Sequence, residues 1–359
     1  MKKLDSIQIL RAVAALLVVF CHGAAEIGTN SPTLWPSVWH AINNKGLFGV
    51  DIFFVVSGFV MMHIVSGLQP GGASAARFIG ERAVRVVPLY WLTTLLSVAI
   101  GMLAPALKHK HAFSAPYLLR SLLFTPSINP ATGAPEPVLG LGWTLNYEMF
   151  FYAIIAVILL LGVRRVFPAL LVVFVSLVVF GAWFQPDDII VKSWTHSIIL
   201  EFLYGALLAR LRLSEWRIGA AAQYVCVTAG VAAWLLLDLP AIGHFDLRGV
   251  VWGLSAAAIF CGLVMGRRQI AWPKGFTLIG DASYSLYLTH LFVMRLCSML
   301  VYHLPLGAVA QALLFLAIFP PAAIALSVVS YRKFELPTMK LGRQIIDARV
   351  NRQRLAETT

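Results

Sequence analysis

The sequence predicts an all-α, polytopic membrane protein with about ten transmembrane helices in one bundle. Composition is the first reason: 59% of the 359 residues are hydrophobic, 12% are charged, and the mean hydropathy is +0.81, whereas soluble domains carry about 25% charged residues. The second reason is that the apolar residues form runs of ~20 residues, the length that crosses a bilayer as a helix. The third is the distribution of lysine and arginine between these runs.

Ten apolar segments are the expected spans. The first resembles a cleavable signal peptide, because two lysines precede it and small residues follow it. Asp5 and Arg11 interrupt the start of its apolar core and further spans follow, so we expect a retained helix. In chain order, the expected spans cover residues 7–25, 46–66, 86–107, 143–163, 166–184, 196–211, 218–237, 249–265, 283–303 and 307–331.

Positive charges predict the orientation of these spans. An even number of spans places both termini on one side. With cytoplasmic termini, the inner segments hold 20 of the 28 Lys and Arg residues and the outer loops hold 6, while Arg11 and Arg295 lie within spans. This bias predicts a multi-pass protein of the cytoplasmic (inner) membrane with both termini cytoplasmic. It also explains the net charge of +12 through dispersed basic residues, so we expect no nucleic-acid partner.

The remaining segments suggest one transmembrane domain over residues 1–331 and a basic cytoplasmic tail over 332–359. The tail is expected to be helical at the inner surface, where membrane lipids of negative charge would hold it. The long outer loop 108–142 combines an apolar patch with prolines, and loops of this length are often functional. It would lie on the membrane surface or dip into it. The four cysteines lie in apolar runs without metal-ligand spacing, which favours buried apolar roles and no metal site.

The first span carries two polar groups on one face. Arg11 and His22 are eleven residues apart, which is close to three helical turns and ~16 Å of rise. An ionisable residue inside a membrane is a functional-site hypothesis by default, because burying it is costly. The predicted orientation places Arg11 toward the cytoplasm and His22 toward the outer side.

Three carboxylates share the predicted depth of this histidine. Asp51, Glu148 and Glu201 all fall in the outer half of the membrane, and Trp143 and Asn146 precede Glu148 on its helix. An imidazole with nearby carboxylates suits general-base catalysis on a hydroxyl, because a carboxylate orients the imidazole that removes the proton. The alternative is that each is a structural polar residue that a neighbouring helix satisfies.

Two other clusters stand out. Arg82 and Arg85 lie one turn apart at the inner surface and form a fork for phosphate, although they also fit a plain positive-inside anchor; Arg11 enters from the same side and could extend this cationic patch. The ninth span opens with serines and tyrosines and places Tyr287 and His290 on one stripe. For His290, packing through a hydrogen bond and contact with a substrate are equally reasonable roles.

Five segments together resemble the acyltransferase-3 family of integral membrane O-acyltransferases, and most closely its exopolysaccharide-production acetylase branch. They cover nearly the whole chain in order, and their combination is specific although no single segment is. The segments are Arg11 with His22, the Gly-Val-Asp-Ile-Phe-Phe-Val-Val-Ser-Gly-Phe run at 49–59, Arg-Ala-Val-Arg at 82–85, Gly-Trp-Thr-Leu-Asn-Tyr-Glu at 142–148 and Ser-Tyr-Ser-Leu-Tyr-Leu-Thr-His at 283–290.

The resemblance implies an enzyme that takes an acyl group, usually acetyl, from cytoplasmic acyl-coenzyme A. It would deliver this group to a sugar hydroxyl of a polysaccharide or lipid-linked glycan at the outer face. Arg11 and His22 match the arginine–histidine pair of the family, and Arg82 and Arg85 match its Arg-x-x-Arg motif. In contrast to fused relatives, this chain is not expected to carry an extracytoplasmic hydrolase-like domain, so a separate extracytoplasmic partner protein is a further expectation.

A mechanism fits both the residues and the resemblance. Coenzyme A would bind near the basic fork, and its pantetheine arm would bring the thioester up the face of the first span. His22 would then act either as a general base on the acceptor hydroxyl or as a transient acyl carrier. The predicted catalytic residues are His22, Arg11, Asp51 and Glu148; those for acyl-coenzyme A are Arg82, Arg85 and Arg11; those for the acceptor are Trp143, Asn146, Tyr287, His290 and Glu201.

Two functions from other classes compete with this hypothesis. Intramembrane charges also mark substrate paths in secondary transporters and flippases, but inverted repeats and matching broken helices are not evident in the two halves of the sequence. A membrane sensor without chemistry is the other alternative. The polar layer at one predicted depth makes the sensor less favourable.

Overall fold

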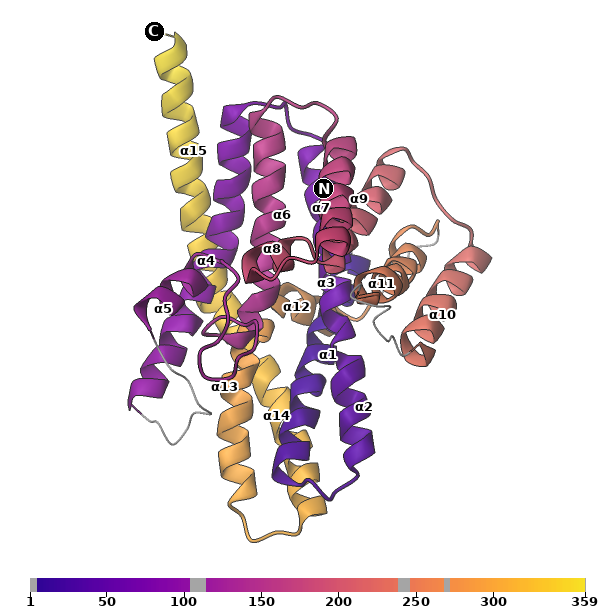
Figure 1. The fold of residues 1–359 in the computed structure, drawn as a ribbon, viewed down its shortest axis with the longest axis vertical. Coiled ribbons are helices and arrows are strands. Elements are labelled where there is room, and N and C mark those ends of the chain that lie inside the picture. The colour runs from indigo at the N-terminus through magenta and orange to yellow at the C-terminus, as the bar shows by residue number, and fades with distance from the viewer. Residues whose placement is uncertain (1–4, 104–113, 238–245, 268–271, 359) are drawn as a thin grey trace. The chain divides into compact units, whose positions relative to one another are not determined.

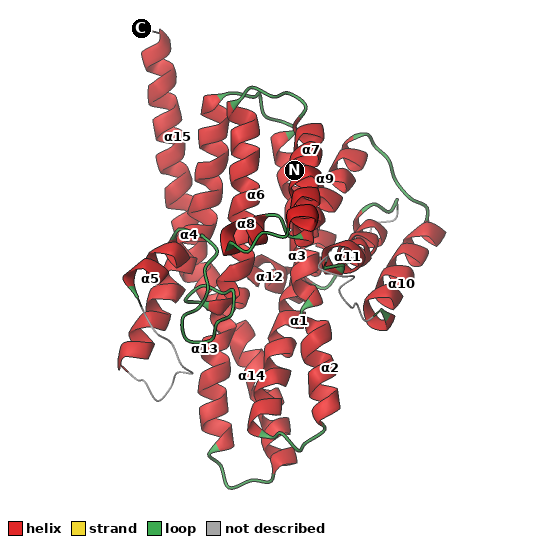
Figure 2. Ribbon diagram, in the orientation of Figure 1, coloured by secondary structure: helices red, strands yellow, loops and turns green. Residues whose placement is uncertain are grey.

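The computed structural model describes residues 5–103, 114–237, 246–267 and 272–358, with side chains up to residue 348. In these parts of the chain the secondary structure is helical, and the only β-type pairing there is an isolated bridge between Ile218 and Gly266 (Figure 2). Some residues used in the predictions lie outside the described parts of the chain. They are the end of the third expected span (104–107) and the basic residues Lys2, Lys3, Lys108, Lys110 and Arg268.

The helices follow one another with short connections. In chain order they are α1 (Asp5–Asn30), α2 (Pro36–Gly46), α3 (Phe48–Val65), α4 (Gly72–Leu103), α5 (Ala115–Leu122), α6 (Trp143–Leu160), α7 (Val166–Phe184), α8 (Ile189–Trp194), α9 (Leu200–Leu213), α10 (Ala220–Leu236), α11 (Arg248–Val264), α12 (Lys274–Asp281), α13 (Ser283–Tyr302), α14 (Ala308–Ser330) and α15 (Leu336–Thr358).

Seven helical stretches in the described chain are long and apolar enough to cross a membrane, which indicates a multi-pass membrane protein. They contain α1, α3, α4, α6, α7, α13 and α14. The other three expected spans correspond to shorter helices: α10 and α11 have 17 residues each and α9 has 14. A helix of 17 residues is ~26 Å long, less than the ~30 Å hydrocarbon core. The prediction of a polytopic all-α protein is confirmed. Of the ten predicted spans, seven correspond to stretches of the described chain that are long and apolar enough to cross a membrane.

The chain divides into two compact units, and each is described by itself. The first unit comprises Met1–Val56, Leu211–Pro240 and Leu247–Tyr331. In it, α1 packs against α2, α12 and α13, while α13 and α14 form an antiparallel pair (Figure 1). Close approach depends on glycine, since a Cβ atom on Gly280 would lie 1.9 Å from the Gln8 carbonyl oxygen and one on Gly49 would lie 2.3 Å from that of Ala14.

The second unit comprises Ser57–Arg210, Ala241–Asp246 and Arg332–Thr359. Its long helix α4 begins at Gly72, well before the expected start of the third span at residue 86, so the basic residues of the expected inner loop are helical. Helix α6 packs along α4, and the C-terminal helix α15 does so as well. The contact of α15 with α4 includes an ion pair between Arg77 and Asp347, with an N–O distance of 3.2 Å.

The long loop after α4 is folded onto that helix. The α5 backbone accepts hydrogen bonds from two α4 side chains: Tyr90 Oη donates to the Ser121 oxygen at 3.0 Å, and Trp91 Nε1 donates to that of Leu122 at 2.9 Å. Tyr117 Oη donates to the backbone oxygen of Glu136 at 2.8 Å. Burial, with the nearby Glu136 charge, raises the pKa of Tyr117 well above its usual range, so this phenol stays a donor at neutral pH. The apolar patch predicted in this loop is therefore helix α5, held against α4.

Candidate functional site

The structure brings His22 of α1 into contact with His290 of α13. Nε2 of His290 lies 3.2 Å from Nδ1 of His22, and the two ring centroids are 5.1 Å apart. His290 is completely buried, whereas His22 is half-buried. Tyr287, one turn earlier on α13, has its ring centroid 6.4 Å from that of His290. Two of the predicted residues of the ninth span therefore lie beside the predicted catalytic histidine.

Backbone contacts fix the tautomers of the two rings. Nδ1 of His290 lies 3.0 Å from the Leu286 carbonyl oxygen, and Nδ1 of His22 lies 2.8 Å from that of Val18. A carbonyl oxygen only accepts, so each Nδ1 carries the proton. Neutral His290 therefore presents a lone pair at Nε2, which accepts a share of the Nδ1 proton of His22. Nε2 of His22 is left unprotonated, and this is the nitrogen that can accept a proton or attack a carbonyl group.

Arg11 lies on the same helix, half-buried and close to three turns before His22. Its Nη1 donates to Oε1 of Gln8 at 3.1 Å. Helix α12 packs closely against the neighbouring turn of α1, because Gly280 lies directly against the Gln8 backbone. Helix α1 is continuous from Arg11 to His22, as the prediction from their spacing requires.

Asp51 is fully buried at the start of α3 and forms an ion pair with Arg248, the first residue of α11. The distance from Nη2 of Arg248 to Oδ2 of Asp51 is 2.9 Å, and the same Nη2 donates to the Leu47 carbonyl oxygen at 3.1 Å. The guanidinium also lies over the ring of Trp252, 5.0 Å from its centroid. The sequence assigned Arg248 to an outer loop, so this partner for Asp51 was not predicted.

Glu148 on α6 belongs to a polar cluster of the second unit. Its Oε1 accepts hydrogen bonds from Ser57 Oγ of α3, at 3.1 Å, and from Tyr152 Oη, one turn further along α6. Ser57 Oγ and Tyr152 Oη are 3.4 Å apart. A carboxylate that accepts from two hydroxyls is held in one orientation.

Arg82 is drawn toward this cluster. It is 6% exposed, its Nη1 lies 3.9 Å from the Met61 sulfur, and it interacts electrostatically with Tyr152. Its Nε is buried and makes no hydrogen bond with any described residue. Arg85 is half-buried, and its positive charge repels that of Arg82. Nη2 of Arg82 lies 3.6 Å from Oε2 of Glu81, so this carboxylate partly compensates the buried positive charge.

The other predicted residues are distributed as follows. Asn146 is buried and its Oδ1 has no hydrogen-bond partner in the described chain, while Trp143 is half-buried and packs edge-on against Tyr147. Glu201, on α9, is fully buried. The first unit thus holds Arg11, His22, Asp51, Tyr287 and His290, and the second holds Arg82, Arg85, Trp143, Asn146, Glu148 and Glu201.

Several polar partners were missed by sequence reasoning. Ser57 lies in the motif at 49–59, and Tyr152 follows Glu148 at the i+4 position, a spacing that places both on one helix face. Glu26 follows His22 at the same spacing and pairs with Arg295 of α13. Both spacings were available as signals. The Asp51–Arg248 pair joins residues 197 positions apart, and no local pattern indicates it.

Among the described residues, no group of three or more His, Cys, Asp or Glu side chains is arranged to hold a metal ion. Cys21, Cys261 and Cys297 are buried free thiols, and Cys226 is a half-buried one.

Comparison with known proteins finds several similar chains. An exopolysaccharide production protein, ExoZ, from Rhizobium meliloti (strain 1021) is 34% identical over 306 residues, which covers 83% of this chain and 91% of that protein. Nodulation protein 10 from Rhizobium leguminosarum bv. viciae is 24% identical over 373 aligned positions, covering 97% and 96% of the two chains. The acyltransferase MdmB from Streptomyces mycarofaciens is 23% identical over 343 positions, covering 82% and 79%.

No solved structure gives a significant match. The family model for the acyltransferase-3 domain matches residues 4–332, which include every helix from α1 to α14 and every residue of the site. The polytopic helices, the paired histidines and this match lead to one conclusion: the chain belongs to the acyltransferase-3 family and is a membrane acyltransferase.

Proposed function

We propose that this protein is an O-acyltransferase that moves an acyl group, most simply acetyl, from cytoplasmic acyl-coenzyme A to a hydroxyl of a cell-surface polysaccharide or glycolipid. The observation that carries the proposal is the His22–His290 contact, which leaves Nε2 of His22 as a basic nitrogen on a membrane helix. The names of the relatives, which include an exopolysaccharide production protein and an acyltransferase, support the acceptor class and the reaction class.

The reaction balances with these groups alone. Nε2 of His22 takes the proton of the acceptor hydroxyl as its oxygen attacks the thioester carbonyl carbon. The resulting imidazolium donates through Nδ1 to Val18 and His290. When the carbon–sulfur bond breaks, the proton passes to the coenzyme A sulfur, and the products are the ester and the free thiol. In the carrier variant of this mechanism, Nε2 attacks the thioester carbonyl carbon and displaces the coenzyme A thiolate. The acceptor hydroxyl then attacks the acyl-imidazolium, neutral His22 leaves, and the hydroxyl proton passes to the thiolate, so the products are the same.

The donor would approach from the cytoplasmic side, which the positive-inside bias of the sequence assigns to the termini. Arg82 and Arg85 would bind the phosphates, and the unused Nε of Arg82 is a donor for one of them. Arg11 would lie at the entrance to the helix face that leads to His22. Asp51, held by the Arg248 guanidinium, would support the first unit's site electrostatically, and Glu148, held by two hydroxyls, is proposed as a catalytic carboxylate of the second unit.

The test is acyl transfer by purified protein in nanodiscs. Radiolabelled acetyl-coenzyme A is incubated with extracellular polysaccharide from a strain that lacks this gene, and labelled polysaccharide is measured. A general base contributes about 10²- to 10⁴-fold to rate, so His22→Ala should lower transfer at least 100-fold. The matched control is His303→Ala, because His303 is exposed near the end of α13 and contacts only the Met299 backbone oxygen, at 2.7 Å.

Full transfer by the His22→Ala protein would reject the catalytic role of this residue. If wild-type protein transfers no label but moves glycan across sealed vesicles, the protein is a transporter or flippase instead. The two mechanisms are separated by incubating the protein with radiolabelled acetyl-coenzyme A without acceptor and stopping the reaction rapidly without acid. The carrier variant leaves label on the protein, whereas the general-base variant leaves none.

A further inference from the structure

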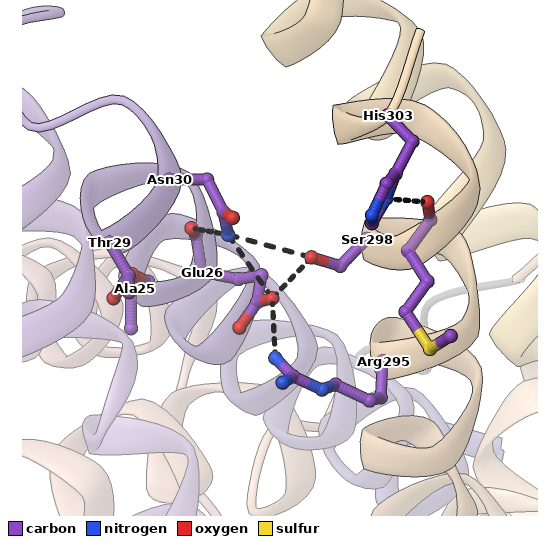
Figure 3. Close-up of polar contacts among 8 residues, drawn as sticks. Ala25, Glu26, Thr29, Asn30, Arg295, Ser298 and His303 are labelled. Atoms are coloured by element: carbon purple, nitrogen blue, oxygen red, sulfur yellow. Dashed lines mark hydrogen bonds and ion pairs between the residues drawn. The ribbon is translucent and has the colours of Figure 1, made fainter. Parts of the chain in front are cut away.

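A second polar cluster lies one turn beyond the two histidines, between the same helices. Glu26 of α1 accepts hydrogen bonds from three side chains at a single atom, Oε1 (Figure 3). The donors are Asn30 Nδ2 at 3.2 Å, Arg295 Nη1 at 3.5 Å, and the hydroxyl of Ser298. Neither the proposed catalytic step nor the donor site uses these residues.

The cluster has unused hydrogen-bonding capacity. Glu26 is 8% exposed, and its Oε1 accepts all three of the hydrogen bonds that the carboxylate makes with described side chains, which leaves Oε2 without one. Nε of Arg295 is buried without a hydrogen-bond partner among the described residues. The same holds for the hydroxyl of Tyr302, which lies within electrostatic range of Glu26. Buried polar groups in folded proteins are normally paired, so these two unpaired buried donors, on side chains that interact with Glu26, call for a ligand or ordered water near this carboxylate.

The position of the cluster relates it to the reacting nitrogen. Glu26 and Asn30 follow His22 by four and eight residues, which places them ~6 and ~12 Å further along α1 on the same stripe. On α13, Arg295 and Ser298 likewise follow His290. Since α1 ends at Asn30, Glu26 lies within about one turn of the end of the helix. An acceptor that entered from this end would meet the cluster before it reached His22.

We propose that Glu26 and Arg295 bind hydroxyl groups of the acceptor sugar and thereby select the position that is acylated. This inference rests on the proposed function. Oε2 of Glu26 accepts from one hydroxyl and the partly exposed guanidinium of Arg295 donates to its neighbour, while a third hydroxyl of the same or the adjacent sugar lies at Nε2 of His22. Because the pair carries one charge of each sign, it favours a neutral diol. A phosphate or uronate would be attracted by Arg295 but repelled by Glu26.

A purely structural ion pair between α1 and α13 predicts a different outcome. The Arg295–Glu26 distance of 3.5 Å is long for a charge-assisted hydrogen bond, and the Arg295 side chain keeps 33% of its exposure. If the pair only joined the helices, its loss would reduce thermal stability and would affect every kinetic constant together. A sugar-binding role instead changes the Michaelis constant for the acceptor alone.

The experiment measures acetyl transfer from radiolabelled acetyl-coenzyme A to the polysaccharide from the gene-deletion strain, at varied concentrations of each. Glu26→Gln keeps the shape and removes the charge. Loss of a hydrogen bond to a charged group corresponds to about 10- to 100-fold, so KM for the polysaccharide should rise by that factor. KM for acetyl-coenzyme A and the thermal unfolding midpoint should stay at wild-type values. Thr29→Ala is the matched control, because the Thr29 hydroxyl on the same turn only donates back to the Ala25 backbone oxygen, at 2.9 Å (Figure 3).

Unchanged KM for the polysaccharide in Glu26→Gln would overturn the proposal, and so would an equal rise in both KM values. Ser298→Ala, which keeps the ion pair, serves if Glu26→Gln fails to accumulate in the membrane; it should raise the same KM by a smaller factor, and a wild-type value would again overturn the proposal. Absence of transfer by the wild-type protein would instead reject the proposed function, so the two failures are distinguishable.

Discussion

At the level of single residues, the active nitrogen is set by backbone carbonyl groups and a second imidazole. Many enzymes orient a catalytic histidine with a carboxylate, whereas His22 has His290 at its Nδ1. A neutral partner avoids placing an additional charge in the membrane, where ionised groups are expensive. It also stabilises the imidazolium less than a carboxylate would, so the proton should pass rapidly to the leaving thiolate.

His290 is accordingly expected to be a positioning residue. A glutamine at this position keeps an acceptor oxygen near the place of Nε2, whereas alanine removes it. We expect His290→Ala to lower the rate of acetyl transfer about tenfold to a hundredfold, in line with the loss of a partner that orients a catalytic group, and His290→Gln to retain most of the activity. The measurement is kcat for transfer to polysaccharide, compared between variants with equal thermal unfolding midpoints. Equal loss in both variants would contradict a role for the acceptor atom.

The sequence predicted which polar side chains stand out better than it predicted which residues contact them. His22 and Glu148 were singled out because a polar group in an apolar helix is conspicuous. The sequence predicted that a nearby carboxylate would orient His22, but the structure pairs His22 with His290 and Asp51 with Arg248. Which helix lies against which is decided by packing over the whole fold, and spacing within one helix carries no information about it.

At the level of helices, the glycines in the motif at 49–59 have a clear role. Gly49 lets α3 approach α1 so closely that a Cβ atom would lie 2.3 Å from the Ala14 carbonyl oxygen. At Gly58 the corresponding distance to the Phe202 carbonyl oxygen of α9 is 2.0 Å. Small residues at such crossings allow the backbone-to-backbone packing that holds membrane helices together. Part of this motif is thus a packing device, and it places Asp51 and Ser57 at their positions.

Gly49→Ala should therefore destabilise the protein. The added methyl group would force α1 and α3 apart, and overpacking of this kind costs about 1–3 kcal/mol. We expect a lower thermal unfolding midpoint in detergent. Gly28→Ala is the matched control on α1, because its Cβ would lie 3.8 Å from the nearest atom, in Trp39, and alanine favours a helix by ~1 kcal/mol. A midpoint for Gly49→Ala equal to that of Gly28→Ala would show that the close crossing is not maintained.

The sequence predicted the existence of helices more reliably than their ends. Apolar runs located every candidate span, because hydrophobicity over ~20 residues is a strong signal. They missed that α4 begins at Gly72, since its first turns are polar and charged. They also overestimated the seventh span, where Ile218 and Gly219 precede the helix and Ile218 instead bridges to Gly266. Hydropathy does not report where the backbone begins to form helical hydrogen bonds.

At the level of the whole molecule, the functional groups are divided between two units. Helix α3 supplies residues to both, with Asp51 in the first and Ser57 in the second. The paired histidines and the Glu26 cluster belong to the first unit, whereas the buried arginine and the Glu148 cluster belong to the second. In the proposed reaction, the first unit supplies the reacting nitrogen of His22, and the second supplies the two arginines that bind the anionic donor.

The direction of the proposed reaction depends on which side of the membrane each loop occupies. The charge bias predicts that the connection after α9 is cytoplasmic and that the loop after α5 lies outside. Both carry an exposed polar residue, Ser214 and Thr132. In intact cells, a membrane-impermeant maleimide should label Thr132→Cys, and it should label Ser214→Cys only after the membrane is permeabilised. The native cysteines, three buried and one half-buried, are controlled for by the wild-type protein. The reverse labelling pattern would place the coenzyme A donor and the sugar acceptor on the opposite sides and would contradict the proposed direction of acyl transfer.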